Sequence, residues 1–403
     1  MRDAFGFYIG RVPLRFGELW AAFYIIFFVF SSQKINKKEM LLVSILVANL
    51  FLTLLGLFFN YGKYDQNFAM KYTLRNLLNI VFILGFLFSS ISFSADNIKG
   101  VMIYSFYVQI CAFVLLYVTH HYFYMNKLLG WENILASGQI VNLLGMKVPR
   151  FMGTSSEPGY LASFLPMLLY YFIESNISHK RIYIAITGLM IVATFSTAVY
   201  IATIAILVVF FANNEIKKKY LWVFILAIVV SILLYFFNAK IQVFVDEVFL
   251  KKILSMFNGD KVNYSATERN LQIRNAIRVF GLNDFIQILV GRGTGGYLYY
   301  TLNFGTGLFS YNVEEAFNLY LSTLVDRGIA GLIILIMLII FLWKHRIKKD
   351  KISNAIFVGI SIQLLHWMIT GNIWQYYFWM EIVFLLGYYR GVNWQVEERD
   401  CLI

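Results

Sequence analysis

The sequence is short of charge and almost free of cysteine, and both shortages narrow the class of protein. Only 14% of its 403 residues are charged, whereas 60% are hydrophobic, a balance far outside that of a soluble globular domain. The two cysteines, Cys111 and Cys401, lie in an apolar run and in the tail, so they offer no disulfide or metal framework. The five histidines lack the spacing of metal ligands. We therefore expect no metal and no cofactor.

The chain also lacks the marks of nucleotide use and of a membrane barrel. No GxxxxGK followed by serine or threonine occurs, which excludes the phosphate-binding loop of nucleotide hydrolases. Short alternating strands are absent, and no cleavable signal peptide opens the sequence, so we expect the first apolar segment to direct the chain to the membrane. No loop that we place in the cytoplasm exceeds roughly ten residues. A fused nucleotide-binding domain is thereby excluded.

Long apolar runs dominate the sequence. Runs such as 221–237 and 331–343 are apolar enough to cross hydrocarbon about 30 Å thick when a flanking helical turn extends them. They are expected to be helices, because lipid offers the backbone no hydrogen-bond partners. Lysine clusters at 34–38, 217–219 and 344–351 are typical of cytoplasmic loops, and they account for much of the net charge of +12 without nucleic acid. We predict an all-α polytopic membrane protein with about eleven spans, within a range of 10–12.

The basic loops also predict which segments lie outside. The chain is expected to form one integral membrane domain, 1–403, with an aromatic surface loop at 120–157 and a large outer loop at 238–317. The apolar stretch 182–211 lies between two basic loops, so it must cross twice and turn back near 194–197. The large outer loop is the most polar part of the chain, and we expect the active site there.

The basic residues of the run 265–296 are all arginines, and the run contains no lysine. A guanidinium offers a rigid fork that matches the oxygens of a phosphate, whereas a lysine is a flexible point charge. The run therefore indicates binding of an anion with defined geometry. Its arginines are Arg269, Arg274, Arg278 and Arg292.

We predict that the segment 266–280 forms a helix that ends at Gly281. Its apolar positions recur at helical spacing: Ile273, Ala276, Ile277 and Phe280. Arg269 falls on the same stripe, and a guanidinium on a buried face needs a partner because its desolvation costs several kcal/mol. We expect an anionic ligand for Arg269. Arg274 and Arg278, paired on the flank, either bind that ligand or form structural ion pairs and headgroup contacts.

A glycine-rich sequence, GRGTGG, occupies 291–296. It lacks the preceding strand and the following lysine of a nucleotide loop. Two interpretations remain open. It is either a tight turn that brings backbone amides and Arg292 toward a common point, or a flexible surface turn.

Carboxylates near the outer face are candidates for binding and proton transfer. Glu157 precedes Pro158, so it either stabilises the positive end of a helix or stands at the mouth of a cavity near Arg150. Glu314 and Glu315 come just before the segment that re-enters the membrane. One of them can take a proton from a hydroxyl group, or both simply begin a solvated helix.

Several of these segments, in order, resemble one family. RFMGTSSEPGYLASF at 150–164 resembles the R-x-x-G-x-x-x-E-P motif of the bacterial O-antigen and capsule polymerases (Wzy) and of the related O-antigen ligases. Residues 193–197 stand where those proteins have a T-x-S turn. The run 265–296 is similar to their S-x-x-x-R and G-x-G segment, with Arg269 on the arginine position.

A further segment resembles the ligases and departs from them at one residue. FNLYLSTLVDRGIAG matches the ligase-type H-N-x₉-G-x-x-G pattern at Asn318, Gly328 and Gly331. Phe317 stands where the ligases have a histidine tied to acceptor activation. The departure favours a polymerase over a ligase, and it leaves the base to Glu314 or Glu315.

The resemblance implies a metal-independent glycosyltransferase of the GT-C type in the bacterial inner membrane, with a periplasmic active face. Donor and acceptor would be undecaprenyl-pyrophosphate-linked oligosaccharides, and the arginines would stabilise the departing pyrophosphate. Arg150, Glu157 and Asn318 would bind substrate. The implied partners are lipid-linked glycans, membrane lipids and a Wzz-like chain-length regulator, without nucleic acid. The alternatives are an O-antigen ligase and a flippase of the same lipid, although transporters commonly show internal repeats that this sequence lacks.

Overall fold

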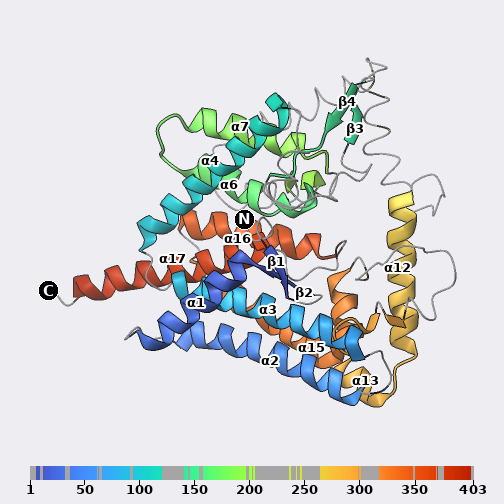
Figure 1. Ribbon diagram of the computed structural model, residues 1–403. Helices are drawn as coiled ribbons and strands as arrows, with labels where there is room; N and C mark the ends of the chain where they lie inside the picture. Colours follow the sequence, from blue (N-terminus) through green and yellow to red (C-terminus); the bar gives the residue numbers. More distant parts are fainter. Residues whose placement is uncertain are drawn as a thin grey trace.

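The chain folds into a bundle of long helices (Figure 1). The computed structural model describes residues 6–31 (without 10–11), 37–119 (without 61, 63–65 and 91–93), 140–204 (without 144–145, 154–157, 197–198 and 202), 264–300 (without 298), 316–400 (without 317, 348–349, 369 and 371–375), and the single positions 236, 242 and 246.

Its helices are α1 (Phe16–Phe30), α2 (Lys37–Phe59), α3 (Gln66–Ser90), α4 (Ala95–Thr119), η2 (Pro158–Leu161), α6 (Phe164–Glu174), α7 (Lys180–Ala193), α12 (Tyr264–Gly281), α13 (Phe285–Val290), α15 (Leu319–Lys344), α16 (Lys351–His366) and α17 (Tyr376–Asp400). Two antiparallel hairpins accompany them: β1 (Gly6–Ile9) with β2 (Val12–Arg15), and β3 (Ile140–Leu143) with β4 (Met146–Pro149).

Helices suited to the membrane form much of the described bundle. Those long and apolar enough to cross it are Glu39–Phe59, Met70–Ser89, Asp96–Tyr117 and Leu319–Lys344. The predicted multi-pass helical membrane protein is thus supported by several spans. Apart from Phe236, the predicted run at 221–237 lies outside the described residues, so a total of about eleven spans stays a prediction.

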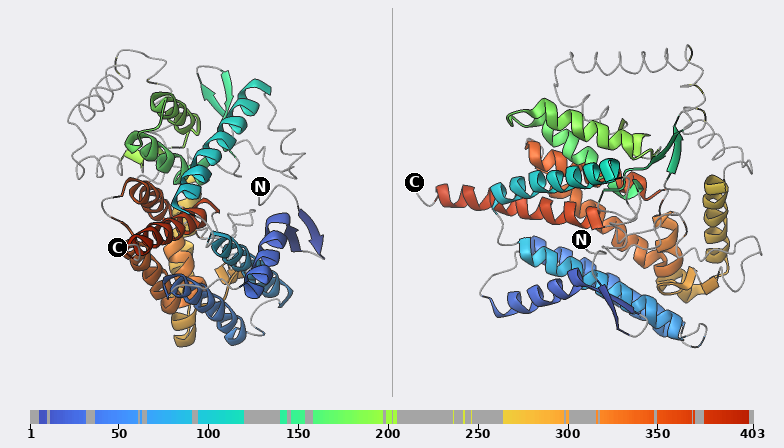
Figure 2. Two further views of the ribbon diagram at one scale, coloured as in Figure 1. Left: turned by 90° about the vertical axis from the view of Figure 1, so that its left-hand side faces the viewer. Right: turned by 45° about the horizontal axis from the view of Figure 1, so that its top comes forward.

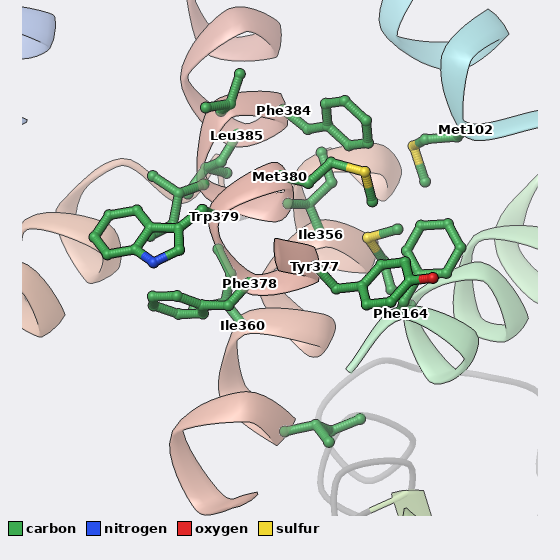
Figure 3. Packing of buried hydrophobic residues seen from close by; sticks show 14 of the residues in the cluster. Met102, Phe164, Ile356, Ile360, Tyr377, Phe378, Trp379, Met380, Phe384 and Leu385 are labelled. Carbon is green, nitrogen blue, oxygen red and sulfur yellow. The ribbon is translucent and has the colours of Figure 1, made fainter. Parts of the chain in front are cut away.

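The centre of the bundle is formed by α16 and α17. Every position from Ile352 to Ile360 and from Tyr377 to Tyr388 is buried, as expected for helices enclosed on all sides. The Tyr377 ring stacks on Phe164 of α6 with centroids 5.0 Å apart, while Trp379 points to the other side of α17 (Figure 3). The Tyr377 hydroxyl also accepts a hydrogen bond of 3.2 Å from Gln109 of α4. The C-terminal helix therefore joins α6, α16 and α4.

A carboxyl group lies inside this core. Glu381 of α17 is 0% exposed, and neither of its oxygens has a hydrogen-bond partner among the described residues. It packs against Gly359 of α16, where an added Cβ would lie 2.8 Å from the Cδ of Glu381. The close approach of the two helices at this point therefore depends on the glycine.

Gly359→Ala is expected to lower the melting temperature of the purified protein, because the new methyl group collides with a side chain that cannot move to solvent. Overpacking of this kind costs about 1–3 kcal/mol. The matched control is Gly188→Ala in α7, where nothing lies within 4 Å of the added Cβ. Equal melting temperatures for the two variants would contradict this account of the α16–α17 contact.

Candidate active site

The glycine-rich loop lies at one end of the bundle, between segments that are distant in sequence. There α12 stands across the ends of α2 and α15 (Figures 1 and 2). The loop backbone touches α2 directly, since a Cβ on Gly56 would lie 2.8 Å from the Cα of Gly293. The amide of Asn60 donates to the carbonyl of Gly56 at 2.7 Å and to that of Gly291 at 3.3 Å. The end of α2 thus holds the loop in place.

The helix before the loop is fixed in the same way. Asp284 caps α13, because its carboxylate accepts from the amide of Gln287 at 2.8 Å and Gln287 returns a contact of 3.3 Å to the amide of Asp284. Gln287 also donates to Asn60 at 2.7 Å. Since Gly291, Arg292 and the following glycines are largely buried, the structure supports the tight turn and not the flexible one.

The loop backbone is bound by α15. Gly291, Gly293 and Gly295 have φ of 80°, 85° and 86°, which glycine adopts without strain. The amide of Arg292 donates to the carbonyl of Val325 at 3.0 Å, and that of Gly293 donates to the carbonyl of Asp326 at 2.9 Å.

A carboxylate binds at two further amides of this segment. Oδ1 of Asp326 accepts from the amide of Tyr297 at 3.1 Å, and the carboxyl group also interacts with the amide of Gly295. Arg327, next in the chain, is 5% exposed and interacts electrostatically with this carboxylate. Sequence reasoning did not select this charged pair, although two charges at the start of an apolar run were a usable signal.

Arg292 joins the loop to α12. Its side chain is 2% exposed, its Nη2 donates to the carbonyl of Val279 at 3.3 Å, and its guanidinium lies 3.9 Å from the centre of the Tyr300 ring. Its Nε has no hydrogen-bond partner among the described residues. A buried guanidinium with a spare donor is suited to bind one further acceptor.

Tyr297 fixes the position of α12 on the loop. Burial, and next the Asp326 carboxylate, raise the pKa of Tyr297, so its hydroxyl stays protonated at neutral pH. It donates to the carbonyl of Gln272 at 3.0 Å and also contacts the side-chain oxygen of that residue. The phenol therefore supplies the polar partner that a buried glutamine needs.

The buried face of α12 is shifted from the predicted stripe. Ala276 and Val279 are buried as apolar contacts and Gln272 as a polar one, whereas Ile277 is 58% exposed. The prediction for Ile277 was wrong because the stripe includes a glutamine, which an apolar pattern does not count. Arg269 stands three residues before Gln272, so the two positions share one face of α12.

The other predicted arginines occupy different surroundings. Arg274 and Arg278 lie on α12 and are exposed, so they do not join Arg292 among the buried groups. Arg150 donates from Nε to the carbonyl of Thr194 and from Nη2 to that of Phe195, both at 3.1 Å. It therefore binds the end of α7, where cations are favourable.

The turn predicted at 194–197 is confirmed as far as the chain is described. Helix α7 ends at Ala193, whose carbonyl accepts from the amide of Phe151 at 2.8 Å. Phe195 has a φ of 45°, a left-handed conformation that redirects the chain. Two segments that resemble family motifs thus contact one another.

Asn318 caps α15. Its Oδ1 accepts from the amide of Leu321 at 3.0 Å, and its Nδ2 donates to the carbonyl of Met368 at 3.1 Å. Leu319 donates to the carbonyl of Trp367 at 2.9 Å. This asparagine thus starts one helix and ties it to the end of α16, a role that the motif alone did not reveal.

Glycine interrupts α15 beside the loop. Gly328 has φ 62° and ψ −164° within the helix. An added Cβ would lie 2.5 Å from the carbonyl carbon and oxygen of Leu289. The kink lets the start of α15 approach the end of α13 and reach the loop.

Some predicted site residues lie outside this description. Glu157, Glu314 and Glu315 are not among the described residues, and of Arg269 only the backbone is described. Within the described part, no three His, Cys, Asp or Glu side chains gather as metal ligands.

Comparison with known families bears on the segment that forms this site. Residues 182–336 match the family model described as O-antigen ligase (Wzy_C), while no curated protein matches the chain. The matched range includes most of α7, all of α12 and α13, the glycine-rich loop, and α15 as far as 336. The segment 182–336, which is less than half of the chain, is thus similar to the O-antigen ligase family, and this confirms the resemblance seen in the sequence.

Proposed function

We propose that this protein is a polymerase that joins undecaprenyl-pyrophosphate-linked repeat units into O-antigen or capsular polysaccharide at the periplasmic face of the inner membrane. The observation that supports it is the arginine-bearing platform of α12 and the glycine-rich loop. This platform lies across the end of a helical bundle, within the segment of the O-antigen ligase family. An anion site at that place suits a lipid whose tail remains in the bilayer.

The proposed reaction is a transfer of the growing glycan from its lipid carrier. A hydroxyl of the acceptor sugar attacks the anomeric carbon of the donor, and the bond from that carbon to the pyrophosphate oxygen breaks. The leaving lipid pyrophosphate gains negative charge, which fixed guanidiniums stabilise as it develops. The hydroxyl proton passes to a carboxylate, which we assign to Glu314 or Glu315.

The arginines would share the binding of the anion. Arg269 is proposed as catalytic, since its position shares one face of α12 with Gln272. Arg292 would offer its spare Nε donor, while the exposed Arg274 and Arg278 would attract the pyrophosphate from the membrane surface.

Substrate binding is also proposed for residues at the neighbouring motif. Arg150 would act by holding the turn after α7, through its contacts with Thr194 and Phe195. Glu157 would face the glycan, and Asn318 would order the start of α15 beside it. A Wzz-like regulator would set the chain length.

Ligase activity is the alternative that a specific observation favours, because the matched family is described as O-antigen ligase. Phe317 in place of the ligase histidine favours the polymerase. A deletion strain separates the two when its surface polysaccharide is analysed on a gel. We expect the ladder to collapse to a single capped repeat. Full-length polymer that remains on its lipid carrier would identify a ligase, and an unchanged ladder would contradict both.

A further inference from the structure

The glycine-rich loop has the geometry of an anion site, and an internal carboxylate already fills it. Glycines with positive φ at 291, 293 and 295 allow the tight turns by which the loop brings its backbone to a negative group. The amide of Tyr297 donates to the carboxylate of Asp326 at 3.1 Å, and the amide of Gly295 interacts with the same carboxylate. The amides of Arg292 and Gly293 are taken by carbonyls of α15.

Because the Asp326 carboxylate occupies the glycine-rich loop, it limits how the loop can contribute to catalysis. A phosphate cannot bind amides that already hold a carboxylate, because two anions would compete for the same donors. The loop is therefore unlike a phosphate-binding loop, in which backbone amides face the ligand. Among the side chains that can bind an anion, Arg292 is the one that the loop itself carries.

We propose that Asp326 is a built-in anion that locks the glycine-rich loop and thereby positions Arg292 for the lipid pyrophosphate. It is a positioning residue, since it acts through the loop and not on the substrate. The assignment rests on the proposed function for the identity of the pyrophosphate, whereas the carboxylate-filled loop itself does not.

The contacts of Asp326 show how the lock would work. The carboxylate fixes residues 295 and 297 on one side of Arg292, while the carbonyls of Val325 and Asp326 fix the amides of 292 and 293. With its backbone held in this way, Arg292 extends its side chain to the carbonyl of Val279 and the ring of Tyr300. Without the carboxylate, the amide of Tyr297 loses its acceptor, the amide of Gly295 loses a favourable partner, and we expect the loop to lose its shape.

Removal of the carboxylate followed by chemical rescue tests this role in the purified full-length protein. Asp326→Ala is expected to reduce glycan transfer at least tenfold and to lower the melting temperature. Formate, which fits the vacated amides, should raise both values for this variant and leave the parent protein unchanged. Formamide is the neutral control and should rescue neither.

A second variant keeps the test decisive if Asp326→Ala does not fold. Asp326→Asn retains the shape but has one acceptor oxygen and no charge, so it should fold, transfer glycan more slowly than the parent and resist rescue by formate. Inhibition by inorganic phosphate provides a further test. It should inhibit Asp326→Ala by entering the open loop, at concentrations that do not affect the parent.

The outcomes separate this proposal from the proposed function. In one outcome, neither the parent nor the variants transfer glycan while formate still stabilises Asp326→Ala selectively. That result would contradict the proposed reaction and support the role of the Asp326 carboxylate in holding the loop. If the parent transfers glycan and folded Asp326→Ala responds to neither formate nor phosphate, the positioning role is overturned. Full activity of Asp326→Asn would also overturn it.

Discussion

Arg269→Ala is expected to abolish long-chain polysaccharide while the protein remains in the membrane. Loss of one preorganised charge donor typically slows turnover by about 10²–10³-fold, and a polymer made by many successive transfers amplifies that loss. The expectation rests on helical register. Arg269 precedes Gln272, Ala276 and Val279, which bring this face of α12 against the loop and the start of α15.

The measurement compares surface polysaccharide on gels with the amount of protein in isolated membranes. Arg269→Lys keeps the charge but loses the fork, so it should recover only part of the activity. Ile277→Ala is the control on the same helix, because Ile277 is 58% exposed and stands off the buried face. Normal long chains from Arg269→Ala would remove this arginine from the reaction.

Gly328→Ala is expected to displace the loop from α15 and to inactivate the protein. Two costs combine at this position. The left-handed φ of 62° disfavours any side chain by about 1–3 kcal/mol, and the added Cβ would lie 2.5 Å from the carbonyl of Leu289. Overpacking against backbone adds about 1–3 kcal/mol more, because the end of α13 cannot yield without moving Gly291.

Gly62→Ala separates these two costs. Gly62 has a comparable φ of 79° but nothing within 4 Å of an added Cβ. It should therefore lose only the conformational part and retain activity. Melting temperature and elution profile of the purified variants provide the measurement, with transfer activity alongside. The account of the kink fails if the two variants behave alike.

The sequence was informative wherever the signal is local. Hydropathy and lysine clusters indicated a helical membrane protein, glycine content indicated a turn at 291–296 without deciding whether it was tight or flexible, and the polar stretch 194–197 indicated the end of α7. The helix over 266–280 is confirmed within α12. In each case composition over a few residues decides the structure, because the backbone responds to its own side chains.

The site contacts could not be predicted because their partners are remote in the chain. Asn60 binds Gly291 across 231 residues, and no periodic pattern connects them. Gln272 is buried only because Tyr297 supplies its partner. Likewise, Asp326 looks like an ordinary charge before a glycine until folding brings it to the amides of the loop.

The contact between Gln109 and Tyr377 has a consequence for biogenesis. The two residues are separated by 268 positions, so α4 is synthesised long before α17 emerges from the ribosome. During that interval the amide of Gln109 lacks this partner, in a bilayer where unsatisfied polar groups are costly. Membrane insertion of α4 therefore precedes its final packing, and the newly made bundle reaches its native state only when the last helix enters between α4, α6 and α16.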